Sequence, residues 1–274
     1  MGKDRSDKNP EGKGQGTELS RKAPPGSGNP MTVNGKNESA GRPERAAGNF
    51  YGRRKAKTLK AAQAEAYETV LPELLIDIGR QAPDMLADLF PHNPKTVVLE
   101  IGFGGGEHLL HRAGLHPEIG FIGCEPFVNG MAKAASGVVE RKLTNIRFYD
   151  EDATDLLDWL PSESLSRIDL LYPDPWPKKR HWKRRFLNAD NVRRFHRLLD
   201  AGGEFRFASD IESYVNWGLR HVLDFKSENG TGFEWTAQKA GDWHEPWPEW
   251  LSTRYEQKAI REGRTPAYFI FTKQ

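Results

Sequence analysis

The chain has 274 residues, 28% of them charged, and a formal net charge of +2. Its length allows one large domain with an appendage, and its net charge is too small by itself to indicate a polyanionic partner. It contains neither an apolar run of about 18 residues nor the apolar stretch of a signal peptide, which predicts a cytoplasmic protein that does not span or enter a membrane.

The N-terminal part, residues 1–48, is rich in Gly, Lys, Asn, Ser, Pro and Glu, and its few apolar residues follow no helical or strand period. Such a segment cannot bury enough apolar surface to fold by itself. We predict a disordered low-complexity tail over 1–48 and one domain over 49–274. A basic aromatic patch, residues 50–57, stands at the junction, and a helical pattern covers 61–71.

Apolar runs then alternate with helical patterns along the rest of the chain. This order predicts an α/β fold with a doubly wound, mostly parallel sheet and helices on both faces. The single cysteine, Cys124, is expected to be a small buried residue of the second strand. Strands are predicted over 96–101, 120–125, 145–150, 167–172 and 203–209, with two more at 233–235 and 268–271, and helices after residue 106, over 128–141, near 156–157 and over 192–199.

Each of the five predicted parallel strands ends at or near an acidic residue. In an open α/β sheet, ligands bind beyond the carboxyl ends of the strands, where the strand order reverses. Clustered carboxylates would repel a phosphate-rich ligand, but they suit a cofactor with a ribose, an ammonium and a sulfonium, which indicates S-adenosylmethionine. The acids are Glu100, Glu125, Asp152, Asp174 and Asp210.

A glycine-rich turn, residues 102–107, follows the first strand. Gly102 and Gly104 allow a ligand to approach the backbone closely, because glycine has no Cβ. Glu107 stands where a dinucleotide-binding turn needs glycine beside the pyrophosphate, which argues against NAD. Glu125 is placed to accept hydrogen bonds from ribose hydroxyls, and Asp152 to accept one from the adenine amine.

The fourth strand leads into a proline-rich turn, Tyr172-Pro-Asp-Pro-Trp-Pro177, followed by six cations in the eight residues 178–185. The prolines restrict the backbone, so Asp174 is expected to be held at the sheet edge beside Trp176, where a base could stack. The basic run predicts phosphate binding, and the substrate is therefore expected to be a nucleic acid. Three arginines of the next helix either extend this run or pair with nearby acids: Arg193, Arg194 and Arg197.

The segments LEIGFGGGEHLL, FIGCEP, LLYPDPWPKKRHWKRRFL, FASD and TRYEQKA together resemble the tRNA (guanine-N7-)-methyltransferases of the bacterial TrmB type. The resemblance extends from about Phe50 to the C-terminus, and its most specific part is PDPWPKKRHWKRR followed by TRYE. It implies a class I Rossmann-like methyltransferase fold, S-adenosylmethionine as methyl donor and guanosine 46 of the tRNA variable loop as acceptor. Two features depart from the family pattern, namely Trp182 within the basic run and the tail before Phe50.

The resemblance also implies roles for individual residues. It carries cofactor binding onto Glu100, Glu125 and Asp152, and catalysis or base positioning onto Asp174. Substrate contacts are implied for Lys178, Asp210 and the segment Thr253, Arg254, Tyr255 and Glu256, and RNA contacts for Arg180, Lys183, Arg184 and Arg185. The sequence indicates no obligate protein partner and is compatible with a monomer or a homodimer.

Guanine N7 carries a lone pair and no proton, so methyl transfer to it needs alignment more than a general base. Our hypothesis is that Asp174 holds the Watson–Crick edge of the base and stabilises the developing cation. Four alternatives are an NAD-dependent oxidoreductase, a methyltransferase of an exocyclic base amine, an RNA-binding protein without catalysis, and a metal enzyme using His108 and His111. The last lacks a clear third ligand in the sequence, and no metal is predicted.

Overall fold

The computed structural model describes Arg54 and residues 58–274. The chain divides into two units, Met1–Arg42 and Pro43–Gln274, and the whole of the first unit lies outside the described residues. The predicted tail therefore stays a prediction, as does the basic aromatic patch apart from Arg54. The carbonyl oxygen of Arg54 accepts a hydrogen bond of 2.8 Å from the backbone N–H of Val128.

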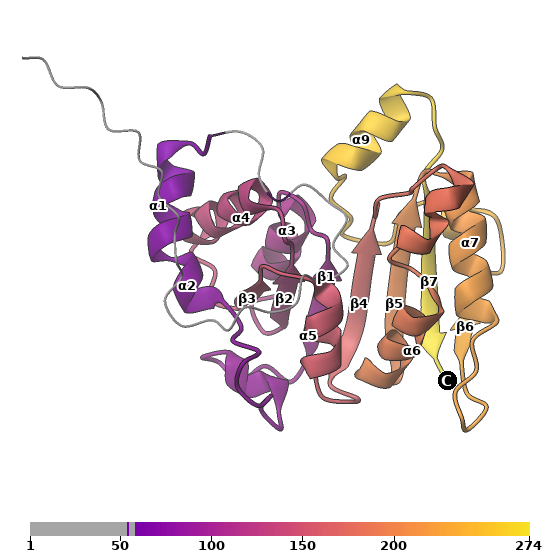
Figure 1. The fold of residues 1–274 in the computed structure, drawn as a ribbon, viewed down its shortest axis with the longest axis horizontal. Coiled ribbons are helices and arrows are strands. Elements are labelled where there is room, and N and C mark those ends of the chain that lie inside the picture. Colours follow the sequence, from indigo (N-terminus) through magenta and orange to yellow (C-terminus); the bar gives the residue numbers. More distant parts are fainter. Residues whose placement is uncertain (1–53, 55–57) are drawn as a thin grey trace, which may run out of the picture. The chain divides into compact units, whose positions relative to one another are not determined.

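Seven strands form one sheet in the order β3-β2-β1-β4-β5-β7-β6 (Figure 1). The first five are parallel, and β7 is antiparallel to both β5 and β6. This arrangement confirms the predicted doubly wound, mostly parallel sheet, including the two C-terminal strands. The strands are β1 (Val97–Ile101), β2 (Gly120–Cys124), β3 (Ile146–Tyr149), β4 (Leu165–Leu171), β5 (Leu199–Ser209), β6 (Phe233–Trp235) and β7 (Ala267–Lys273).

Helices cover both faces of the sheet, as predicted. None of those in the described part of the chain is long and apolar enough to cross a membrane. The patterns over 61–71, 128–141 and 192–199 all correspond to helices, whereas α7, α8 and α9 were not predicted. The helices are α1 (Ala61–Thr69), α2 (Leu71–Leu74), α3 (Glu107–Leu115), α4 (Val128–Arg141), α5 (Ala153–Trp159), α6 (Ala189–Leu198), α7 (Glu212–Leu223), α8 (Gly241–His244) and α9 (Arg254–Arg261), with 3-10 turns η1 (Leu86–Leu89) and η2 (Lys179–Arg184).

Two hydrophobic cores lie on opposite faces of the sheet. Alternate residues of a strand point to opposite faces, so Leu99 of β1 enters the core shared with α5, α6 and α7, whereas its neighbour Val98 enters the core shared with α1, α3 and α4. Cys124 is buried in the first of these cores, as expected for a strand residue. The strand order reverses between β1 and β4, so a crevice is expected beyond their carboxyl ends.

The start of α4 packs directly against the glycine-rich turn. A Cβ built on Gly130 would lie 2.1 Å from the carbonyl oxygen of Gly104, a distance at which backbone must move. Gly104 itself has φ +60°, in the left-handed region that favours glycine. The position of the turn therefore depends on the absence of a side chain at Gly130.

We expect Gly130→Ala to lower the free energy of unfolding by about 1–3 kcal/mol, because the added methyl group overpacks a backbone contact. Urea unfolding of the full chain measures this. The matched control is Gly114→Ala in α3, where the nearest atom to a new Cβ is Leu143 Cδ2 at 3.9 Å. That substitution should leave stability unchanged or raise it by about 0.5–1 kcal/mol, since alanine favours the helix. Equal effects of the two substitutions would contradict the tight contact.

Candidate active site

A cavity of about 740 Å³ opens at the carboxyl ends of the central strands. The sheet edge supplies five of the predicted site residues to its wall: Gly102, Gly104, Glu125, Asp152 and Asp174. Other elements supply five more: Lys183, Arg184 and Arg185 from η2 and the residue after it, and Arg254 and Tyr255 from α9. Residues predicted from separate segments therefore meet around one cavity.

The glycine-rich turn and the end of β2 are joined through one carboxylate. Glu125 accepts hydrogen bonds from the backbone N–H of Gly104 at 2.7 Å and from that of Phe127 at 3.0 Å. Burial raises the pKa of Glu125, while these two bonds act in the opposite direction. Gly102 and Gly104 both have positive φ, as a tight turn after β1 requires. A carboxylate oxygen has further lone pairs, so Glu125 can still accept hydrogen bonds from a ligand.

Glu100 occupies a different position from the other predicted cofactor residues. It is only 3% exposed and borders a smaller cavity beside the main one. Its carboxylate lies 2.9 Å from Nδ1 of His108. Glu100 does not line the main cavity. Its contact with His108 instead joins β1 to α3 beside the glycine-rich turn.

Potential ligand atoms of Glu100, His108 and Asp169 lie within 4.8 Å of one another. The sequence pattern His108-x-x-His111 is thus not the pair that the fold assembles, because Asp169 replaces His111 in the group. The Nε–H of Arg167 donates to Asp169 at 3.1 Å, so a guanidinium already neutralises charge in this cluster. We interpret the cluster as a buried ion-paired network.

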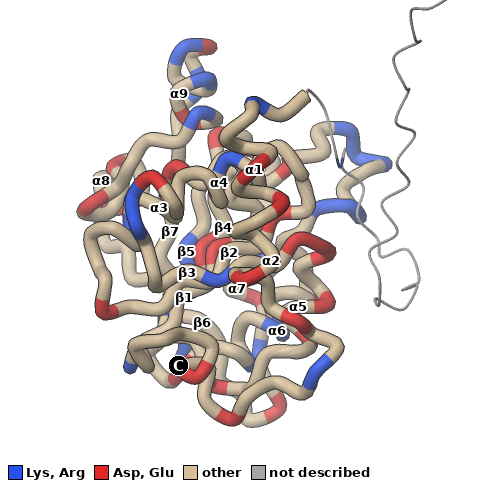
Figure 2. Tube along the Cα trace, turned by 90° about the vertical axis from the view of Figure 1, so that its left-hand side faces the viewer, with Lys and Arg blue, Asp and Glu red and all other residues tan. Residues whose placement is uncertain are grey.

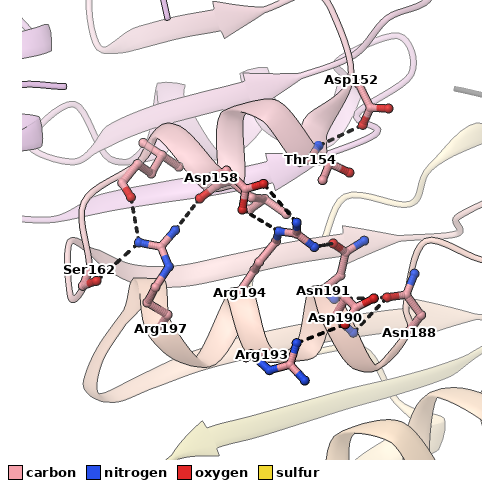
Figure 3. Close-up of polar contacts among 12 residues, drawn as sticks. Asp152, Thr154, Asp158, Ser162, Asn188, Asp190, Asn191, Arg193, Arg194 and Arg197 are labelled. Atoms are coloured by element: carbon pink, nitrogen blue, oxygen red, sulfur yellow. Dashed lines mark hydrogen bonds and ion pairs between the residues drawn. The ribbon is translucent and has the colours of Figure 1, made fainter. Parts of the chain in front are cut away.

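Asp152 is the N-cap of α5. Its Oδ1 accepts a hydrogen bond of 2.9 Å from the backbone N–H of Thr154, which orients the carboxylate (Figure 3). The side chain is held at the end of the third strand, where the sequence predicted it, and lines the cavity.

Asp174 lies in a backbone turn that includes two non-glycine residues in the left-handed region. Tyr172 has φ +51° and Trp176 has φ +43°, conformations that cost free energy and persist only where surrounding contacts hold them. The backbone N–H of Tyr172 donates to the carbonyl of Ala208 at 2.8 Å. Desolvation by the cavity wall raises the pKa of Asp174 above its ordinary value.

Arg185 holds this turn in place, and its predicted contact with RNA does not fit its environment. The side chain is 1% exposed. Its Nε–H donates to the carbonyl of Pro175 at 2.9 Å, and its two terminal nitrogens donate to the carbonyl and hydroxyl oxygens of Ser213 at 2.8 and 3.0 Å. The guanidinium also packs against the rings of Trp182 and Tyr214, with its Cζ 4.5 and 4.8 Å from their centroids. Three of its five N–H donors are therefore engaged within the protein.

Trp182, which departs from the family pattern, has a structural role in the same assembly. Its ring packs edge-on against Trp217, with centroids 5.7 Å apart, and covers one side of the Arg185 guanidinium. The aromatic pair therefore forms part of the pocket that fixes Arg185. We attribute the unusual tryptophan to this packing.

Most of the other cations of the basic run are exposed, and Arg184 is half-buried. Lys178, Arg180 and Lys183 are exposed, and Lys183 also lines the cavity. The guanidinium of Arg184 lies 5.0 Å from the centroid of the Trp176 ring, beside the turn that carries Asp174. These four cations fit the predicted phosphate-binding surface better than Arg185 does.

The three arginines of α6 pair within the protein, which was one of the two outcomes that the sequence left open. Arg194 contacts both carboxylate oxygens of Asp158, at 2.6 and 2.9 Å, and lowers the pKa of that acid (Figure 3). Arg193 donates to Asp190 at 3.0 Å, and Arg197 donates to the carbonyl of Leu160 at 2.9 Å. Arg193 thus contacts the first turn of α6 itself, whereas Arg194 and Arg197 connect α6 to α5 and to the residue after it.

The predicted substrate segment, residues 253–256, divides into two roles. Thr253 is the N-cap of α9 and accepts from the backbone N–H of Glu256 at 3.1 Å. Arg254 and Tyr255 line the cavity, and a Cβ on Gly104 would lie 3.2 Å from Nη2 of Arg254. Glu256 is 3% exposed and points away from the cavity into the protein.

Residues that the sequence did not predict anchor Glu256. The indole N–H of Trp250 donates to it at 2.8 Å, and the hydroxyl of Tyr268 donates to its other oxygen. The ring of Trp250 also packs against His108, with centroids 5.1 Å apart, so this contact connects α9 to the Glu100–His108 pair. No short-range pattern signals such partners, because His108, Trp250 and Tyr268 belong to separate elements.

Asp210 forms an ion pair with Arg264, in the connection between α9 and β7. It does not line the main cavity. Its contact with substrate stays a prediction, and its visible role is to tie the C-terminal connection to the end of β5.

The sheet order, with an antiparallel β7 beside β5 and a cavity at the reversal point, is that of the Rossmann-like class I methyltransferase fold. A family model described as "Putative methyltransferase" matches residues 94–268. A curated relative from Agrobacterium fabrum, a tRNA (guanine-N(7)-)-methyltransferase, is 57% identical over 85% of this chain and 98% of its own length. A relative of the same name from Chelativorans sp. is 53% identical over 84% and 97%. The chain belongs to the tRNA (guanine-N7-)-methyltransferase family.

Among solved structures, the crystal structure of the 16S rRNA methyltransferase KamB aligns with a TM-score of 0.45 and 14% identity. The alignment covers 66% of this chain and 89% of the KamB chain.

We expect Arg185→Gln to lower the free energy of unfolding by about 1–3 kcal/mol, because it leaves buried carbonyl and hydroxyl acceptors without donors. Urea unfolding measures the loss. Arg180→Gln, an exposed site in the same run, should change stability by less than about 0.5 kcal/mol. If the two substitutions had equally small effects, Arg185 would not hold the turn.

Proposed function

We propose that this methyltransferase transfers a methyl group from S-adenosylmethionine to N7 of a guanine in tRNA, at position 46 of the variable loop. One observation carries the proposal. The carboxylates of Glu125, Asp152 and Asp174 line a single cavity, and two cations of η2, Lys183 and Arg184, line that same cavity. These carboxylates suit a cationic donor, and the cations at the same cavity suit an RNA backbone.

The residues of the cavity fit the proposed donor. Glu125, already oriented by Gly104 and Phe127, would accept hydrogen bonds from the ribose hydroxyls. Asp152 would accept one from the adenine amine, and the glycine-rich turn would receive the methionine part without steric obstruction. Glu100 would help to hold this turn through its contact with His108, at the start of α3. When bound, S-adenosylmethionine supplies the methyl group as an electrophile on a sulfonium.

Asp174 would act on the acceptor base. Guanine N7 needs no deprotonation, so the carboxylate would position the base by accepting hydrogen bonds from its Watson–Crick edge. Its negative charge would also favour the positive charge that develops on the imidazole ring during transfer. The strained turn and its Arg185 support would hold Asp174 in place for both roles.

The RNA backbone would contact Lys178, Arg180, Lys183 and Arg184. Arg254 and Tyr255 would contact the substrate from the opposite element, α9, while Thr253 and Glu256 would position them. Asp210 would help to position α9, because its ion pair with Arg264 fixes the connection between α9 and β7. We assign Arg185 to positioning rather than to RNA contact.

The direct experiment is to incubate the purified full chain with labelled S-adenosylmethionine and unmodified tRNA transcript, and to map the product by cleavage at 7-methylguanosine. We expect cleavage at one variable-loop guanosine and loss of labelling when that guanosine is replaced. Label on an exocyclic amine would overturn the N7 assignment, and absence of any label with bound tRNA would favour an RNA-binding protein without catalysis.

Asp174→Asn should lower kcat by about 10²–10³-fold, because it removes the charge that stabilises the transition state while preserving shape. Steady-state kinetics with saturating tRNA measure the change. Asp88→Asn, on an exposed turn in η1, is the matched control and should leave kcat unchanged. Nearly full turnover by the Asp174 variant would show that the carboxylate is not needed.

The rate should also fall in acid at a higher pH than an ordinary aspartate would produce. Desolvation raises the pKa of Asp174, so its carboxylate is protonated earlier as the pH falls. Because the charged form is the active one, kcat is expected to decline through that raised pKa and to be constant above it. A pH profile of kcat for the wild type, compared with the residual rate of Asp174→Asn, tests this, since the variant should lack the acid limb.

A further inference from the structure

One face of α9 is fixed against the protein. Glu256 and Ala259 are 3% and 0% exposed, and Glu256 accepts the hydrogen bonds from Trp250 and Tyr268 described above. With 3.6 residues per turn, these two positions lie on the same side of the helix. The anchored face therefore determines which residues α9 presents outward.

Three cations lie on the opposite side. Arg254, Lys258 and Arg261 are spaced i, i+4 and i+7, which aligns them along one helical stripe. All three are exposed, and the side chain of Lys258 is 61% exposed. We call these three residues the α9 stripe. Figure 2 shows Lys and Arg positions along α9, which stands out from the neighbouring trace.

Arg254 lies near the carboxylates of Glu107 and Glu125, whereas the described residues neutralise the outer part of the stripe only weakly. Lys258 lies 3.9 Å from Glu262, at the limit of an ion pair, and Glu262 also pairs with Arg264. Exposed ion pairs of this kind contribute little free energy and are easily exchanged. Tyr255, at 49% exposure, and the exposed Gln257 lie on either side of the stripe, so this side of α9 faces solvent.

The stripe begins at the cavity. Arg254 lines it from α9, and Lys183 lines it from η2. Exposed cations therefore reach the same cavity from two elements that are far apart in sequence. A base entering the cavity would bring its flanking backbone phosphates near both groups.

We propose that the α9 stripe binds the phosphate backbone of the substrate RNA and, together with η2, clamps the nucleotides on either side of the target base. This inference rests on the proposed tRNA substrate. It extends the contact surface beyond the cavity to Lys258 and Arg261, which the family resemblance does not assign. The charge, spacing and exposure of the stripe match a polyanionic backbone, whose recognition needs no fixed sequence.

The test is equilibrium binding of fluorescent tRNA transcript to the full chain at several salt concentrations. For Lys258→Gln combined with Arg261→Gln, we expect Kd to rise about tenfold at moderate salt. The slope of log K against log salt should fall in magnitude by about 1–2, since two phosphate contacts are lost. Arg220→Gln is the matched control, because Arg220 forms an exposed i,i+4 pair with Asp224 on α7 at 3.5 Å. It should change neither quantity.

Two further measurements make the result decisive. Lys258→Arg combined with Arg261→Lys should restore both Kd and slope, and calorimetric binding of S-adenosylhomocysteine should be unchanged in all variants, which excludes a general loss of fold. An unchanged slope in the Gln double variant would overturn the inference. So would a loss that the charge-preserving variant fails to restore.

The failure of this inference can be told from the failure of the proposed function. If the wild type methylates tRNA at N7 and the Gln double variant binds it equally well, only the stripe is wrong. If the wild type neither binds nor methylates tRNA, the proposed function itself is wrong.

Discussion

The site depends on a close approach of three segments at Gly104. Glu125 accepts the N–H of this residue, α4 contacts its carbonyl oxygen at a position where only Gly130 fits, and Arg254 of α9 passes beside it. A side chain at this point would separate the segments, because protein interiors leave little room for displacement. The same contacts that pack the domain thereby place a carboxylate, a glycine turn and a cation around one cavity. Packing and ligand geometry are thus determined together.

Basic residues in the described part of the chain include two groups with different physical roles. Arg185, Arg194 and Arg197 satisfy their donors on carbonyl, hydroxyl or carboxylate oxygens of the protein and hold loops and helices together. Lys178, Lys183 and Lys258 keep their side chains in solvent. A guanidinium offers five donors in a rigid plane and suits the first role, whereas exposed cations of either kind attract a polyanion. Counting cations in a basic run therefore overestimates its capacity to bind RNA.

The sheet and much of the cavity could be predicted from sequence. The apolar runs determined the strands, and the rule that ligands bind beyond their carboxyl ends placed Glu125, Asp152 and Asp174 together. The same rule did not place Glu100 and Asp210 at the main cavity, because each pairs with a residue from another element, His108 and Arg264 respectively. The family resemblance, which assigned Glu256, gave no sign of its partner Trp250. The burial of Arg185 was not predicted either, since the alternation of exposed and buried residues in an irregular turn follows no period.

The sequence by itself determined the class of fold, the family and the chemical character of the site, because these follow from local periodicity, from turn residues and from motifs contiguous in the chain. Only the tertiary structure decided which charged residues are engaged inside the protein and which face solvent. It also decided that η2 and α9, about 70 residues apart, border one cavity. Burial and pairing depend on the partners that folding brings into contact, and those partners are not neighbours in the sequence.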